Sequence, residues 1–255
     1  MAVRWMTIFL DRPADTVGVA TAFWELVTGT TRSAYRGDRR QFTTLVPSDG
    51  DAHVRVQGVD DGPGGTHLDL HTNDVELLVR RATDLGATLE EAEPVHVLRS
   101  PGVYRWCAVG WYGETRPSPP QTGPSGARSR LDQLCLDIAP DQFDDEVSFW
   151  AGLLGWPAVR STVRPEFTSL TRPGAMPARL LLQRRDHGDG PTTGHIDLAA
   201  GEHVDDVVAD HLAAGAELER REWIWTVLRD PSGQRYCVTR RDPIQGVVTH
   251  LPPPP

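Results

Sequence analysis

The sequence predicts an α+β protein made of two tandem copies of one domain, each copy built from two β-α-β-β-β modules. Short motifs recur in the same order about 125 to 130 residues later, a Pro-, Gly- and Ser-rich segment separates the two sets, and strand and helix patterns alternate within each set. We expect copy one at 1–115, a linker at 116–129, copy two at 130–245 and a Pro-rich tail at 246–255.

The repeat is visible in motifs that keep their order along the chain. The Phe-Trp pair at 23–24 recurs at 149–150, an offset of 126, and His67-Leu-Asp-Leu recurs as His195-Ile-Asp-Leu at an offset of 128. Cys107 and Cys237 are 130 residues apart. Offsets that rise in small steps are expected when duplicated domains diverge by short loop insertions, whereas chance matches would not stay in order.

The charge and composition indicate what kind of molecule the protein binds. The formal net charge is −9, and the 24% of residues that are charged form no run of one sign, which argues against a nucleic acid or an anionic membrane as the partner. We expect a small-molecule ligand and a monomer or homodimer. No apolar run approaches the roughly 20 residues that span a bilayer, no secretion signal is evident, and the three cysteines form no C-x-x-C pair, so a cytoplasmic protein with reduced thiols is expected.

Copy two begins with a strand and a helix. Residues 131–138 alternate in polarity, as in a half-buried strand. An apolar stripe with helical spacing runs from Val147 to Leu154, and Gly155 is expected to end this helix, with Asp141 or Asp144 as its N-terminal cap.

Short strands separated by Pro and Gly complete this first module, and the same order of elements then repeats. The remaining expected elements are strands at 158–163, 167–171, 179–183 and 194–199, a helix at 204–214, and strands at 217–220, 224–229 and 235–239. Copy one shows the same order from Arg4 to Trp111.

Three stretches of copy two carry a family resemblance. They are Phe-Trp-Ala-Gly-Leu-Leu-Gly-Trp on the helix, His-Ile-Asp-Leu on a strand, and Asp-Pro-Ser-Gly-Gln-Arg-Tyr-Cys-Val near the end. With them the sequence resembles the glyoxalase-like branch of the glyoxalase / bleomycin resistance / dioxygenase (vicinal oxygen chelate) superfamily. The resemblance implies two tandem domains, each a curled, mostly antiparallel sheet around a pocket, but this fold hosts many reactions.

The resemblance also implies where a metal ion would bind. In the metalloenzymes of the superfamily, His or Gln and Glu side chains from the first and last strands of the modules hold a divalent cation. The corresponding positions are Gln133, Gln183, His195 and Cys237 in copy two, and Trp5, Gln57, His67 and Cys107 in copy one. Neither set contains a carboxylate, although anionic oxygens normally neutralise much of the cation's charge.

We therefore expect no metal ion and no other cofactor. The alternative is a divalent metal ion held by Gln133, Gln183, His195 and Cys237, with the cysteine as a thiolate.

His195 is the candidate catalytic residue. A neutral imidazole beside Asp197 or Gln133 can move a proton on a bound ligand, while the alternative is that His195 only fills space and bonds across the strands. The ligand-binding residues that we expect are Gln133, Gln183, Asp197, Trp225 and Cys237 in copy two, and Trp5, Gln57, His67, Trp106 and Cys107 in copy one.

The aromatic residues divide into two groups. Trp5, Trp106 and Trp225 lie on strands, where their rings either stack on a planar ligand or belong to the core. Trp24 and Trp150 lie on helical stripes and are expected in the core.

These observations lead to three functional hypotheses. The first is a metal-independent protein that binds a small, planar or aromatic molecule, as in the sequestration of an antibiotic or metabolite. The alternative is a lyase- or isomerase-type enzyme, either with a metal ion in a non-standard site or metal-free with His195 as acid and base. The third is a regulatory or scaffolding module whose pockets no longer bind a ligand.

Overall fold

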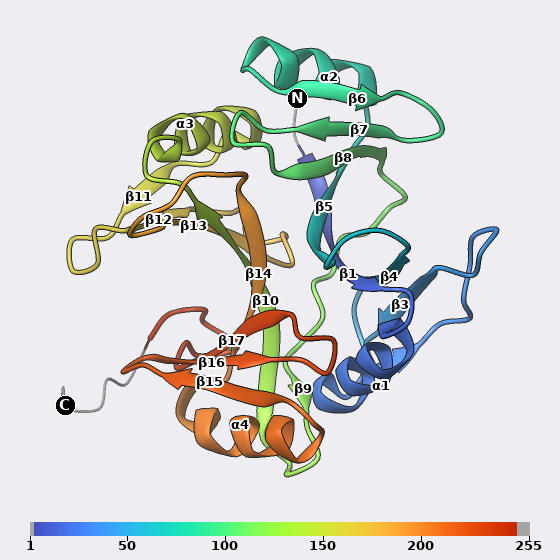
Figure 1. Cartoon of the computed structure of the whole chain (residues 1–255), viewed down its shortest axis with the longest axis vertical. Helices are drawn as coiled ribbons and strands as arrows, with labels where there is room; N and C mark the ends of the chain where they lie inside the picture. The colour runs from blue at the N-terminus through green and yellow to red at the C-terminus, as the bar shows by residue number, and fades with distance from the viewer. Residues whose placement is uncertain (1–2, 249–255) are drawn as a thin grey trace. The chain divides into compact units, whose positions relative to one another are not determined.

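The computed structural model describes residues 3–248, and it contains four β-α-β-β-β modules in the predicted order (Figure 1). Most of the predicted Pro-rich tail, 249–255, lies outside the described residues. Within 3–248, no helix combines the length and the apolar character needed to cross a bilayer. A cytoplasmic location stays a prediction.

Copy one supplies the first two modules. Their elements are β1 (Val3–Pro13), α1 (Val17–Thr28), β2 (Thr31–Arg32), β3 (Phe42–Val46) and β4 (Val54–Val59), then β5 (Gly65–Thr72), α2 (Val75–Asp84), β6 (Thr88–Glu91), β7 (His96–Arg99) and β8 (Arg105–Gly110).

Copy two supplies the other two modules, preceded by the short strand β9 (Gln121–Thr122). Their elements are β10 (Arg128–Ile138), α3 (Phe143–Leu154), β11 (Ala158–Arg160), β12 (Phe167–Leu170) and β13 (Arg179–Arg184), then β14 (Thr193–Ala199), α4 (Val204–Ala213), β15 (Glu217–Arg221), β16 (Trp225–Arg229) and β17 (Arg235–Thr239).

Each copy forms one sheet with the same strand order. Copy one has β2-β3-β4-β1-β5-β8-β7-β6, and copy two has β11-β12-β13-β10-β14-β17-β16-β15. Strands β5 and β8 run parallel, as do β14 and β17, while the outer pairs of each sheet are antiparallel. The predicted α+β class with mostly antiparallel sheets is confirmed.

Contacts divide the chain into two compact units that combine modules of different copies. Unit 1 contains the described part of Met1–Phe9, Thr66–Arg116 and Leu134–Gly194, and unit 2 contains Leu10–Gly65, Pro117–Gln133 and the described part of His195–Pro255. Each unit therefore holds one module of copy one and one of copy two. The domain boundaries inferred from the repeat stay a prediction.

Two local expectations need correction. Helix α3 begins after Gln142, which makes no side-chain cap, so neither Asp141 nor Asp144 has the predicted capping role. Asp144 instead lies in the first turn, where an acidic side chain interacts favourably with the helix dipole. Gly155 ends the helix with a φ of 68°, as predicted, because glycine adopts this left-handed conformation without steric cost.

The predicted linker is also partly structured. Strand β9 pairs with the start of β10, where Arg128 lies opposite Thr122 and Ser129 opposite Gln121. This pairing extends β10 beyond the strand expected from polarity alone, because backbone hydrogen bonds to β9 do not depend on an alternating side-chain pattern.

The core of unit 1 is aromatic. Phe149 and Trp150 on α3 lie 6.5 and 6.1 Å from Trp106 on β8, measured between ring centroids. Glu146 on the same helix accepts hydrogen bonds from the backbone of Gly102 (2.7 Å) and from Nε1 of Trp150 (2.9 Å). Burial raises the pKa of this carboxyl group. The predicted core position of Trp150 is confirmed.

The core of unit 2 has the same plan with different residues. Trp24 on α1 packs against Tyr236 on β17, with ring centroids 4.9 Å apart. Asp230 accepts hydrogen bonds from Nε1 of Trp24 (3.0 Å) and from Nε of the buried Arg12 (2.8 Å). His211 on α4 is fully buried and its Nδ1 shares a hydrogen bond with the Tyr236 hydroxyl (2.9 Å). Trp24 is thus a core residue, as predicted.

Candidate metal centre

Three side chains of unit 2 bring metal-ligating atoms together. His195 and Asp197 lie two residues apart on β14, so they project from the same face of the strand. Cys237 on the parallel neighbour β17 lies opposite Asp197 in the strand register. One ligand atom from each of the three side chains lies within 4.8 Å of the other two. We call this group centre 2.

The carboxylate of Asp197 is the most constrained group of centre 2. Asp197 is only 4% exposed, and its Oδ2 accepts a hydrogen bond from the side-chain amide of Gln133. Oδ1 lies 3.4 Å from Nε2 of His195 but accepts no hydrogen bond from any described residue. A buried carboxylate oxygen without a donor is costly, and a bound cation would satisfy it.

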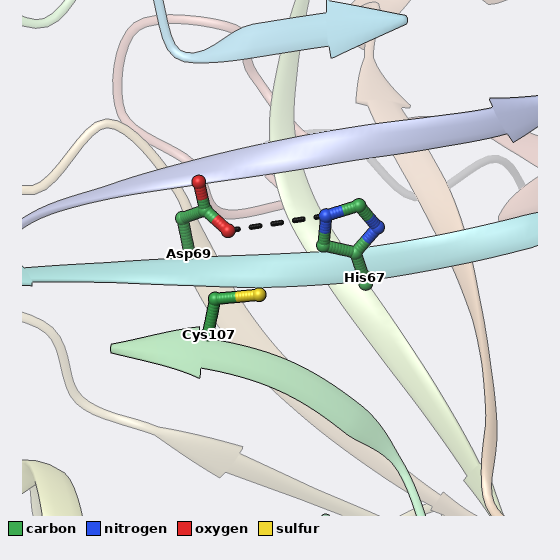
Figure 2. A group of neighbouring side chains, drawn as sticks. All are labelled: His67, Asp69 and Cys107. Atoms are coloured by element: carbon green, nitrogen blue, oxygen red, sulfur yellow. Dashed lines mark ion pairs between the residues drawn. The ribbon is translucent and has the colours of Figure 1, made fainter. Parts of the chain in front are cut away.

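Unit 1 contains the corresponding group, centre 1. His67 and Asp69 lie on β5, and Cys107 lies opposite Asp69 on the parallel strand β8. Figure 2 shows the imidazole and the carboxylate on one side of β5, next to the thiol of the neighbouring strand, and Nε2 of His67 is 3.9 Å from Oδ1 of Asp69. The ring of Phe9 stacks on His67, with centroids 4.3 Å apart and an interplanar angle of 16°.

The donor set fits a borderline-soft divalent ion such as zinc. Imidazole nitrogen, carboxylate oxygen and thiolate sulfur are all zinc ligands, and ligand atoms in a tetrahedral site lie roughly 3.5 Å apart, which small side-chain rotations would reach here. A carboxylate and a thiolate together neutralise the charge of a divalent cation. Three protein ligands also leave one coordination position open, as in catalytic zinc sites.

Of the other expected ligand-binding residues, Gln133 contacts centre 2 through Asp197. Gln183, on β13, belongs to unit 1, where its Oε1 lies 3.6 Å from the sulfur of Cys135. Gln57, on β4, is partly exposed and pairs with Phe42 of β3. Their roles in ligand binding stay predictions.

The three strand tryptophans differ in burial. Trp5 and Trp106 are fully buried, and Trp106 packs against the aromatic side chains of α3. Trp225 begins β16 and is partly exposed. Ligand stacking by Trp5, Trp106 and Trp225 stays a prediction.

Comparisons with known proteins agree with this fold. A model of the glyoxalase-like domain matches residues 7–109 and 133–239, whereas no curated protein sequence matches the chain. The structure resembles the Mn(II)-bound glyoxalase from Novosphingobium aromaticivorans, with a TM-score of 0.63 and 14% identity over 99% of this chain and 88% of that one.

Two dioxygenases are similar to the same degree. The 2,2',3-trihydroxybiphenyl 1,2-dioxygenase from a dibenzofuran-degrading Sphingomonas wittichii has a TM-score of 0.62 and 13% identity, over 93% of this chain and 90% of that one. A variant of homoprotocatechuate 2,3-dioxygenase from B. fuscum has a TM-score of 0.62 and 14% identity, over 94% of this chain and 72% of that one. At such identities the likeness concerns the fold.

The expectation of no metal cofactor is wrong. Each unit brings histidine, carboxylate and thiol ligands together, and a protein of the same fold carries Mn(II). The four positions per copy that correspond to the superfamily's metal ligands contain no carboxylate. Asp69 and Asp197 lie outside these positions, but each follows its histidine by two residues and therefore shares its face.

Proposed function

Because the chain belongs to the glyoxalase-like domain family, we propose that it is a metal-dependent enzyme of the lyase or isomerase type, with its metal ion at centre 2. The observation that carries the proposal is the His-x-Asp pair with a cysteine opposite the aspartate, which occurs at the same place in both units. This proposal replaces the metal-independent sequestration that the sequence favoured.

The residues of centre 2 have distinct roles in this proposal. His195, Asp197 and Cys237 hold the ion, and the amide of Gln133 keeps the carboxylate of Asp197 in place. When bound, the ion supplies a Lewis acid that polarises a substrate oxygen. A donor set with a thiolate favours redox-inactive zinc and therefore Lewis-acid chemistry over oxygen activation.

The substrate that we propose is a small planar or aromatic molecule with oxygen substituents. Two of the structurally similar proteins are dioxygenases whose names refer to hydroxylated aromatic compounds. The three ligand residues are each less than a tenth exposed, and this burial keeps bulk water away from the polarised oxygen, which strengthens the electrostatic interaction.

Centre 2 is the better candidate for turnover. In centre 1 the stacked ring of Phe9 covers one face of the His67 imidazole, and the position of Gln133 is occupied by Trp5, which cannot orient a carboxylate in the same way. We propose that centre 1 is at most a second metal site.

Metal analysis of the purified protein tests this function. The wild type and the variants C107S and C237S are dialysed against metal-free buffer and analysed for zinc, manganese, iron and nickel, and then loaded with Co²⁺. We expect a thiolate-to-cobalt charge-transfer band that persists in C107S, in which only centre 2 keeps its cysteine, and that disappears in the double variant C107S/C237S. Absence of tightly bound metal together with absence of the band in the wild type would refute the proposal.

A ligand titration adds a functional readout. Catechol should quench tryptophan fluorescence saturably in the zinc-loaded wild type and in C107S, and the effect should be lost in C237S. Equal quenching in all three proteins would place the ligand away from centre 2.

A further inference from the structure

A small cavity with a mostly apolar wall and a few polar side chains lies within unit 2, separate from centre 2. Its volume is about 30 Å³, and it lies between the end of α1, strands β3 and β4, the segment around β9 and the first residues of β10. A water molecule needs about 10–15 Å³ on the same measure, so the cavity holds more than one water-sized group. None of the residues of centre 2 lines it.

The wall of the cavity contains basic side chains and no acidic ones. Arg130 contributes a guanidinium group and His53 an imidazole, while no aspartate or glutamate is among the lining residues. Nε2 of His53 donates a hydrogen bond to the backbone oxygen of Leu131 (2.8 Å), which holds the ring in the wall.

One nitrogen of the partly buried Arg130 has no acceptor. Its Nε is buried and donates no hydrogen bond to a described residue. Asp132, two residues further along β10, is engaged by Nη1 of Arg241 at 2.7 and 2.9 Å. Burial lowers the pKa of Arg130, against the opposing effect of Asp132, but a guanidinium remains charged at neutral pH. A buried guanidinium nitrogen without an acceptor is costly, and an anion bound in the cavity would supply one.

Two hydroxyl groups complete the set of donors. Ser118 and Ser129 line the cavity and are buried. Of the threonines in the wall, Thr28 donates to the backbone oxygen of Trp24, and its hydroxyl oxygen pairs with that of Thr30 (2.8 Å). The two serines are therefore the hydroxyl donors that we assign to a ligand in this cavity.

We propose that this cavity binds a small oxyanion, a phosphate or carboxylate group, through the guanidinium of Arg130 and the hydroxyls of Ser118 and Ser129. The planar guanidinium can donate two parallel hydrogen bonds to two oxygens of such a group. The serines donate to the remaining oxygens, and the absence of acidic lining residues avoids repulsion.

Calorimetric titration with inorganic phosphate and with acetate, at low ionic strength and with chloride as the reference anion, tests the proposal. We expect saturable binding of at least one oxyanion to the wild type, and binding at least about tenfold weaker to R130Q, because a charge-assisted hydrogen bond is lost. The anion that binds more tightly identifies the preferred chemistry.

The matched control is R128Q, which removes an exposed arginine from the same strand and should bind like the wild type. S129A keeps the fold and the charge and should bind severalfold more weakly, so it tests the site even if R130Q fails to fold. A C107S/C237S background should leave the affinity unchanged, which separates this site from any anion bound by a metal ion. No saturable binding to the wild type, or equal binding to R130Q, R128Q and S129A, would overturn the proposal.

Discussion

The two units contain the same three metal-ligating residue types, but the residues beside them differ. In unit 2 the amide of Gln133 holds Asp197, whereas the matching position in unit 1 is Trp5, which is fully buried. In unit 1 the ring of Phe9 lies flat on His67. The comparison indicates that the duplicated strands kept their ligand atoms while the first strand of each copy diverged, so the two centres are not equivalent.

The cores of the two units show the same kind of difference. Each has a tryptophan whose indole donates to a buried carboxylate, but Glu146 comes from the helix itself and Asp230 from the turn after β16. Asp230 also pairs with Arg12, whereas Glu146 accepts a backbone amide. The acceptor for the buried indole N–H therefore comes from a different position in each unit. Of these two carboxylates, only Asp230 of unit 2 also forms an ion pair.

The largest effect should come from breaking that ion pair. D230N leaves the buried guanidinium of Arg12 without its anion and should lower the free energy of unfolding by about 3–5 kcal/mol. E146Q leaves no buried cation without its anion, because Glu146 accepts its hydrogen bonds from a backbone amide and an indole. It should lower the free energy of unfolding by about 1–2 kcal/mol. Urea denaturation of both variants measures the difference. If E146Q is as destabilising as D230N, the ion pair does not distinguish the core of unit 2 from that of unit 1.

The next effect separates the two centres. D197N keeps the shape of the side chain but removes its charge. Changing a residue that only hydrogen-bonds to a metal ligand weakens metal binding by up to about 100-fold. Because Asp197 is itself a proposed ligand, D197N should weaken metal binding at centre 2 by at least about 100-fold. D69N should leave the metal bound at centre 2 unchanged. Competition with a chelator of known affinity gives both values, and equal losses would show that the centres act alike.

A pH effect should distinguish the cores. Burial lowers the pKa of His211 to about 4, from its usual 6.5. The unfolded chain therefore binds a proton that the folded chain does not, and stability is lost as the pH falls below about 6.5, by about 2 kcal/mol between pH 7 and pH 5. The variant H211Q should lose this part of the pH dependence.

Glu146 should act in the opposite direction. Because its pKa is raised in the folded state, its contribution to stability decreases as the pH rises above the value of the unfolded carboxyl group. Denaturation curves of H211Q and E146Q between pH 5 and pH 7 should therefore deviate from the wild type with opposite slopes. Parallel slopes for the three proteins would contradict both assignments.

The smallest effect should come from the residue that orients Asp197. Q133L removes the amide donor and should weaken metal binding at centre 2 about tenfold, the lower end for a change in an outer partner. The measurement is made in a C107S background, so that only centre 2 responds. An unchanged affinity would mean that the contrast between Gln133 and Trp5 has no consequence for the metal.

Several features could be predicted because they depend on short distances along the chain. The two-residue spacing of His195 and Asp197 places both on one face of a strand, and Gly155 ends its helix because of its own conformational freedom. The offsets between motifs likewise revealed the duplication and the order of the modules. In these cases the amino-acid sequence by itself determines the local structure.

Other features were decided only by the tertiary structure. The parallel pairing of β14 with β17 brings Cys237 opposite Asp197, and no local pattern specifies that register. The pairing of modules from different copies within each unit arises from contacts between distant segments, and so does the cavity wall in which Nε of Arg130 has no acceptor. Local periodicity encodes which face a side chain occupies, whereas burial and long-range packing decide which groups meet there.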